Sequence, residues 1–216
     1  MNYFDLRRNS VDEFTTYMPP ENVISLLRDD DRILDFGYGA GYLLRTLRKR
    51  GFKNLSGCEI DTRCLASKEL DGIDFIDLNE SVLTEKYDVI IISHVIEHIE
   101  KNKVIEFLKS LKKSLNKHGR LIISTPNAQS TTGVFWLYAD FTHEYIYTYG
   151  SLYYVLSAAG YVNMRMIGPS KNLYSLFLPL FKKCLGLVNR VTNSFYDHRF
   201  ENIYSFELIM VCNNNE

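Results

Sequence analysis

The stretch R-I-L-D-F-G-Y-G-A-G-Y, from Arg32 to Tyr42, joins an apolar run and an acid to glycines at positions 37, 39 and 41. Such a pattern predicts a buried strand, a tight turn, and a helix whose first amide groups are open to a ligand. These are the parts of a nucleotide-type pocket. A dinucleotide fingerprint has the spacing G-x-G-x-x-G/A, and Tyr42 stands where its third small residue would be. The turn is therefore less suited to a dinucleotide.

Short apolar runs alternate with longer helical patterns along most of the chain. The runs D-V-I-I-I-S and R-L-I-I-S-T are continuously apolar, as expected for central strands of a parallel sheet that is covered on both faces. We therefore predict one α/β domain over residues 1–216, with helices on both faces of the sheet. Strands are predicted at 32–36, 55–59, 73–76, 87–93, 120–125, 161–167 and 205–212, and helices at 41–49, 62–69, 101–116 and 151–159.

Composition excludes several classes of protein. A formal net charge of -1 gives no electrostatic reason to expect nucleic-acid binding. The four cysteines lack C-x-x-C spacing, so neither a zinc site nor a disulfide framework is indicated, and no metal is predicted. The N-terminal residues lack the apolar core of a signal peptide, and no apolar run is long enough to span a membrane. A soluble cytoplasmic protein with reduced thiols is expected.

Two segments lie outside the strand and helix alternation. Residues 1–30 are expected to form an N-terminal helical cap. Residues 169–202 form an unusually apolar insertion before the last strand, with Lys182, Lys183 and Arg190 beside it. This insertion could be a further helical cap over the pocket, or an interfacial segment that contacts a membrane surface or a lipid-linked substrate. The sequence gives no prediction of the oligomeric state.

The second predicted strand ends in Glu59, where a carboxylate can accept both ribose hydroxyls of a bound nucleoside. With Asp35, Gly37, Gly39 and Gly41, the turn resembles motif I, D/E-x-G-x-G-x-G, of class I S-adenosylmethionine-dependent methyltransferases. The segments S-G-C-E-I-D and F-I-D-L-N resemble the parts of that family that follow motif I. An NAD enzyme could use Glu59 in the same way, and the resemblance favours the methyltransferase interpretation.

This resemblance implies a Rossmann-like, seven-stranded methyltransferase sheet, mostly parallel with an antiparallel last strand. It implies S-adenosylmethionine as the cofactor and S-adenosylhomocysteine as the product. The ribose would bind at Glu59 and the methionine portion near the glycine turn. The cofactor-binding residues that it implies are Asp35, Gly37, Tyr38, Gly39, Gly41, Glu59, Ile60, Asp77, Leu78, Ser93 and His94.

Three later segments extend the resemblance over residues 30 to 166. K-Y-D-V-I-I-I-S-H-V-I-E-H-I resembles motif II and its loop, and L-N-K-H-G-R-L-I-I-S-T-P-N resembles the family's next strand, with K-H-G in place of P-G-G. A-D-F-T-H-E and the residues after it resemble a subgroup of small methyltransferases. Many members of that subgroup act in pathways for surface polysaccharides and secondary metabolites, so a small-molecule acceptor such as a sugar or nucleotide-sugar is expected.

The sulfonium of the cofactor already activates the methyl group, so the protein must mainly align an acceptor and remove a proton if the acceptor is a hydroxyl. Histidine is the natural base. His143, in D-F-T-H-E, is the first candidate, and the alternative is that it only anchors its loop. His94 is the second candidate, whereas His98 is expected to be structural.

Three other functions are compatible with the sequence. The acceptor could be an amine or a phosphorylated intermediate, for which little general-base help is needed. An NAD-dependent oxidoreductase or epimerase is disfavoured by Tyr42 and by the absence of a Tyr-x-x-x-Lys pair. The third alternative is a catalytically inactive binding module that kept the fold.

Overall fold

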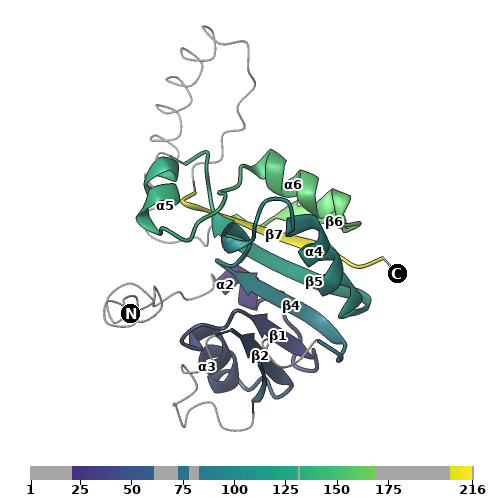
Figure 1. Ribbon diagram of the computed structural model, residues 1–216. Helices are drawn as coiled ribbons and strands as arrows, with labels where there is room; N and C mark the ends of the chain where they lie inside the picture. Colours follow the sequence, from purple (N-terminus) through teal and green to yellow (C-terminus); the bar gives the residue numbers. More distant parts are fainter. Residues whose placement is uncertain (1–20, 61–72, 78–82, 131, 169–204, 216) are drawn as a thin grey trace, which may run out of the picture.

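The computed structural model describes residues 21–60, 73–77, 83–130, 132–168 and 205–215 (Figure 1). The predictions for residues 61–72, for Leu78 and for the 169–202 insertion lie outside the described residues. Of the predicted N-terminal cap, only residues 21–30 are described, and they contain the short helix α2, Glu21–Ile24. No helix in the described ranges is long and apolar enough to cross a membrane.

Seven strands form one sheet in the order β3-β2-β1-β4-β5-β7-β6. Strands β1 to β5 pair in parallel, whereas β7 lies antiparallel between β5 and β6 (Figure 1). This arrangement confirms the predicted α/β sheet with an antiparallel last strand. The strands are β1 Ile33–Phe36, β2 Leu55–Glu59, β3 Asp74–Asp77, β4 Tyr87–Ser93, β5 Leu115–Pro126, β6 Val162–Met166 and β7 Glu207–Asn213.

The central strand β4 shows why both faces of the sheet are covered. Successive side chains of a strand point to opposite faces. Ile90 and Ile92 belong to the core beneath α4, Val104–Lys113, and α6, Tyr149–Ala158. Val89 and Ile91 belong to the core beneath α2 and α3, Tyr42–Lys49. Because each fully buried Ile or Val contributes about 1.5–3 kcal/mol, this strand fixes the two-sided packing.

The sequence-based boundaries fail near residue 115. The predicted helix 101–116 ends at Lys113, and Leu115 instead opens β5 and pairs with Tyr87. Leu115 also fits the helical spacing of apolar residues, so its position was decided by pairing with a distant strand. Two elements were not predicted, the 3-10 helix η3, Ile96–His98, and the helix α5, Gly133–Ala139.

Candidate active site

The carboxyl ends of the parallel strands bring the predicted site residues to one edge of the sheet. Phe36 is level with Cys58 of β2 and Ile92 of β4, so the glycine turn begins beside Glu59 and Ser93, the last residues of these two strands. Asp77 is level with Glu59 at the end of β3. Ligands of open α/β sheets bind at this edge.

The glycine turn after β1 needs its first glycine for steric reasons. Gly37 has φ 77°, and a Cβ added there would lie 2.5 Å from Cγ2 of Val95, in the loop after β4. At Gly39, with φ 50°, an added Cβ would meet no atom within 4 Å. Gly41 then caps α3. The turn therefore packs against the β4 loop at Gly37 and faces open space at Gly39.

The carboxylate of Glu59 joins the glycine turn to the end of β2. Its Oε2 accepts a hydrogen bond of 2.9 Å from the backbone N–H of Gly39, and its Oε1 accepts one of 2.7 Å from Ile60 N–H. Each carboxylate oxygen has a second lone pair that can accept a hydroxyl. Ile60 exposes 60% of its surface beside this carboxylate. A polar acceptor and an apolar face thus lie together after β2.

Asp35 lies beneath the glycine turn and is almost completely buried. Burial, together with the nearby charge of Glu59, raises the pKa of its carboxyl to about 8. Tyr38 is also buried, and its ring packs edge-on against Phe75 of β3 with the ring centroids 5.1 Å apart. The buried side chains beneath the turn thus include an acid, Asp35, whose raised pKa lets it bind a proton near neutral pH.

His94 follows β4 in the left-handed region, with φ 54°, and its backbone N–H donates to the carbonyl of Ser124 at 3.0 Å. Its Nδ1 lies 3.3 Å from Oε1 of Glu97, and its Nε2 lies 3.3 Å from Oε2 of Glu207. Burial alone would lower the pKa of the imidazole, but the two carboxylates outweigh it and raise this pKa to about 9. His94 is therefore an imidazolium at neutral pH.

Glu97 lies in η3 and is completely buried. Burial would raise the pKa of this carboxyl, but its contact with His94 holds the pKa below its usual range. Its Oε2 accepts a hydrogen bond of 3.0 Å from the hydroxyl of Thr125. Its backbone carbonyl accepts from the N–H groups of Glu144 and Tyr145, at 2.8 and 3.2 Å. Glu97 thus fixes the loop that carries His143.

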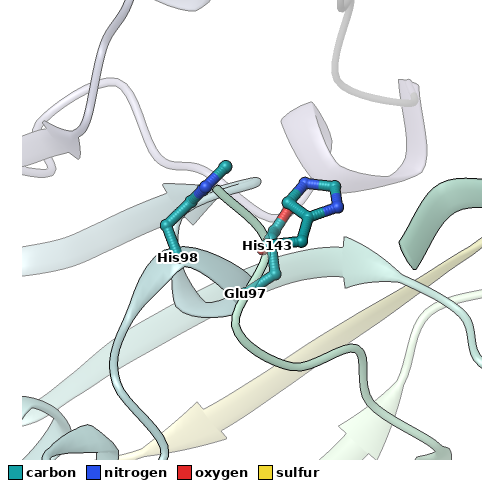
Figure 2. Close-up of side chains that lie close together, drawn as sticks. All are labelled: Glu97, His98 and His143. Carbon is teal, nitrogen blue, oxygen red and sulfur yellow. The ribbon is translucent and has the colours of Figure 1, made fainter. Parts of the chain in front are cut away.

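The side chains of His143 and His98 lie close to Glu97 (Figure 2), and the centroids of the two imidazole rings are 4.8 Å apart. Nδ1 of His143 lies 2.7 Å from the carbonyl oxygen of Trp136. A carbonyl can only accept, so this Nδ1 carries the proton and Nε2 carries the lone pair.

The same tautomer follows for His98. Its Nδ1 lies 2.8 Å from the hydroxyl of Thr142, which itself donates to Oδ1 of Asp140 at 2.7 Å. The hydroxyl must therefore accept from Nδ1 of His98, which leaves Nε2 with the lone pair. Burial lowers the pKa of this imidazole, so His98 is neutral at neutral pH.

Comparison with known proteins agrees with this geometry. A family model described as "Methyltransferase domain" matches residues 5–165, well over half of the chain. The chain belongs to this methyltransferase family. No curated protein matches the sequence closely enough to count as a relative.

Solved structures show the same fold as this methyltransferase. A SAM-dependent methyltransferase from Archaeoglobus fulgidus is 18% identical, with a TM-score of 0.63, over 98% of this chain and 100% of that one. An S-adenosylmethionine-dependent methyltransferase from Mesorhizobium loti is 13% identical, with a TM-score of 0.59, over 89% and 95%.

Phosphoethanolamine N-methyltransferase 2 of Haemonchus contortus, solved with S-adenosyl-L-methionine, is 14% identical, with a TM-score of 0.59. The alignment covers 94% of this chain and 55% of that one. Together with the family match, these structures support S-adenosylmethionine as the cofactor of the methyltransferase.

Sequence reasoning missed two partners of the methyltransferase's histidines. Glu207, which contacts His94, opens β7 and lies 113 residues away along the chain. Thr142, which fixes the tautomer of His98, is a loop residue beside the predicted His143. No local pattern marks Glu207, whereas the T-H pair at 142 and 143 was the available signal for Thr142.

Proposed function

We propose that this methyltransferase methylates a hydroxyl group of a sugar, nucleotide-sugar or related small metabolite, in polysaccharide or secondary-metabolite biosynthesis. The observation that carries the proposal is the contact of 2.7 Å between Nδ1 of His143 and the carbonyl oxygen of Trp136. Nδ1 donates to this carbonyl, so Nε2 of His143 is an acceptor nitrogen in the loop fixed by Glu97. A hydroxyl acceptor needs such a base, whereas an amine does not.

For the cofactor, we propose that the glycine turn from Asp35 to Gly41 receives the methionine portion. Glu59 binds the ribose hydroxyls with the carboxylate that also accepts hydrogen bonds from the N–H groups of Gly39 and Ile60. The adenine ring lies against the exposed side chain of Ile60. Asp77, Ser93 and His94, at the ends of β3 and β4, complete the proposed cofactor set together with Leu78, which lies outside the described residues.

In the proposed reaction, the acceptor oxygen attacks the methyl carbon while its proton moves to Nε2 of His143. The carbon–sulfur bond breaks, and its electron pair stays on sulfur, which gives S-adenosylhomocysteine. His94, already protonated between two carboxylates, is poorly suited to take up this proton. We assign it instead a positioning role, in which it keeps the buried Glu97 ionised.

The test is methyl transfer from radiolabelled S-adenosylmethionine to a panel of nucleotide-sugars, sugar phosphates and amines. His143→Ala should lower kcat for a hydroxyl acceptor about 10²- to 10⁴-fold while the affinity for S-adenosylhomocysteine stays unchanged. His118→Ala, an exposed histidine of β5 outside the cluster, is the matched control.

The alternatives predict different results. Methylation of amines alone, with little effect of His143→Ala, would replace the hydroxyl by an amine or phosphorylated amine acceptor. Cofactor binding without transfer to any member of the panel would favour an inactive module. Binding of NAD in place of S-adenosylmethionine would contradict the cofactor assignment.

A further inference from the structure

The cluster around His143 contains a second histidine and a buried carboxylate, which proton transfer to His143 does not require. Glu97, His98 and His143 each offer an atom that can bind a metal ion, and these three atoms lie within 4.8 Å of one another (Figure 2). Two imidazoles and one carboxylate are a common ligand set for divalent transition metals. We propose that these three residues bind a divalent first-row transition ion.

Hydrogen bonds at Nδ1 orient both histidines so that Nε2 can bind a metal ion. Nδ1 of His143 donates to the carbonyl of Trp136, and Nδ1 of His98 donates to the hydroxyl of Thr142. Metal-binding histidines usually donate their second ring nitrogen to a carbonyl, carboxylate or other fixed acceptor, because this sets the tautomer and the ring orientation. No described residue is hydrogen-bonded to Nε2 of either ring, so both lone pairs are available.

The third ligand is a buried carboxylate. Glu97 is 0% exposed, and its Oε2 is fixed by the hydroxyl of Thr125. Its Oε1 is buried and, within the described part of the chain, accepts no hydrogen bond of normal geometry. Oε1 also lies 3.3 Å from Nδ1 of His94, whose Nε2 lies 3.3 Å from Oε2 of Glu207. A divalent cation is suited to this environment.

The donor atoms select the class of ion. Imidazole nitrogens suit Zn²⁺, Cu²⁺, Fe²⁺ or Ni²⁺, whereas Mg²⁺, Ca²⁺ and Mn²⁺ prefer oxygen ligands. Bond lengths of about 2.0–2.2 Å to a single ion require ligand atoms roughly 3–3.5 Å apart. The three side chains would therefore close by about an ångström around the ion. Three protein ligands leave further positions for water or an acceptor oxygen.

The role of such an ion rests on the proposed hydroxyl methylation, although the metal site itself does not. A divalent ion lowers the pKa of a bound hydroxyl, so the acceptor would lose its proton to solvent and remain as a metal-bound alkoxide. This alkoxide oxygen would then attack the methyl carbon, and the electron pair of the broken carbon–sulfur bond would stay on sulfur. Because Nε2 of His143 cannot bind the ion and take up a proton at once, this route applies to the metal-loaded enzyme, and direct proton transfer to His143 applies to the metal-free enzyme.

The experiment is a titration of the full chain, freed of metal by chelation, with Co²⁺. The visible absorption of Co²⁺ reports on its coordination, and Zn²⁺ is then added as a competitor. We expect one equivalent of Co²⁺ to bind with an intense visible band that Zn²⁺ displaces. His98→Ala, His143→Ala and Glu97→Gln should each weaken binding at least about tenfold, whereas His118→Ala should leave it unchanged.

S-adenosylhomocysteine affinity is measured on every variant, because retained binding shows that a variant is folded even if Glu97→Gln destabilises it. The absence of Co²⁺ and Zn²⁺ binding by folded wild-type protein would overturn the metal site without affecting the methyltransferase assignment. Equal loss of binding in His118→Ala and His143→Ala would also overturn it, since it would place the ion elsewhere. If the site binds Co²⁺ but only amines are methylated, the hydroxyl proposal fails and the metal site stands.

Discussion

At the level of single residues, Asp35 has an unusual pKa among the residues at the carboxyl edge of the sheet. Its carboxyl is buried beneath the glycine turn, near the carboxylate of Glu59, and its pKa is raised to about 8. The folded protein without cofactor therefore keeps this acid protonated at neutral pH. A positively charged ligand nearby would favour the ionised form, so cofactor binding at this turn, as proposed above, would lower the pKa of Asp35.

We predict that Asp35 makes stability depend on pH. The unfolded chain ionises Asp35 near its ordinary pKa of 3.8 and the folded chain near 8. The stabilisation from this raised pKa is complete below pH 3.8 and is lost as pH rises through 8, because the unfolded state binds fewer protons in that range. Denaturant unfolding from pH 5 to 8 should show wild type losing up to about 1.4 kcal/mol per pH unit relative to Asp35→Asn.

The matched control for this experiment is Asp74→Asn, at an exposed position of β3. Its unfolding free energy should follow the wild-type pH dependence. If the unfolding free energy of Asp35→Asn has the same pH dependence as that of wild type over this range, the pKa of Asp35 is not raised in the folded protein.

At the scale of elements, one buried ion pair joins β5 to the segment that follows α2. Nη2 of Arg120 lies 2.6 Å from Oδ2 of Asp31, and its Nη1 donates to the carbonyl of Leu26. Both side chains are largely buried, at 19% and 7% exposure. By contrast, Arg32 and Glu85 form an ion pair at 2.8 Å whose side chains are 49% and 59% exposed. The two ion pairs thus have similar distances but differ in burial.

Arg120→Ala should therefore lower the free energy of unfolding by about 3 kcal/mol, because it leaves the buried Asp31 carboxylate without its charged partner and, among the described residues, with only the N–H of Arg28 as a donor. The control Arg32→Ala should lower it by less than about 1 kcal/mol, since water replaces the lost contact. Chemical denaturation at neutral pH measures both variants. Equal losses for the two would show that burial does not decide the energy of these pairs.

At the scale of the whole molecule, the sheet was predictable because its central strands are continuous apolar runs that need cover on two faces. The glycine spacing located the turn, and Gly37 is indeed required by the approach of Val95. The surroundings of the histidines were not predictable. His94 meets Glu207 only because β7 inserts antiparallel beside β5, and His98 meets His143 only because the loop from Asp140 folds onto η3. These contacts depend on distant segments, and no local pattern encodes them.

We propose that the glycine turn after β1 binds S-adenosylmethionine in this methyltransferase. The most direct measurement is calorimetric titration of S-adenosylhomocysteine into wild type, Gly39→Arg and the control Gly51→Arg. Both glycines have positive φ and open space around an added Cβ, but Gly51 follows the far end of α3. We predict one-to-one binding by wild type and Gly51→Arg, and none by Gly39→Arg. Equal binding by all three proteins, or no binding by folded wild type, would show that the glycine turn does not bind the cofactor.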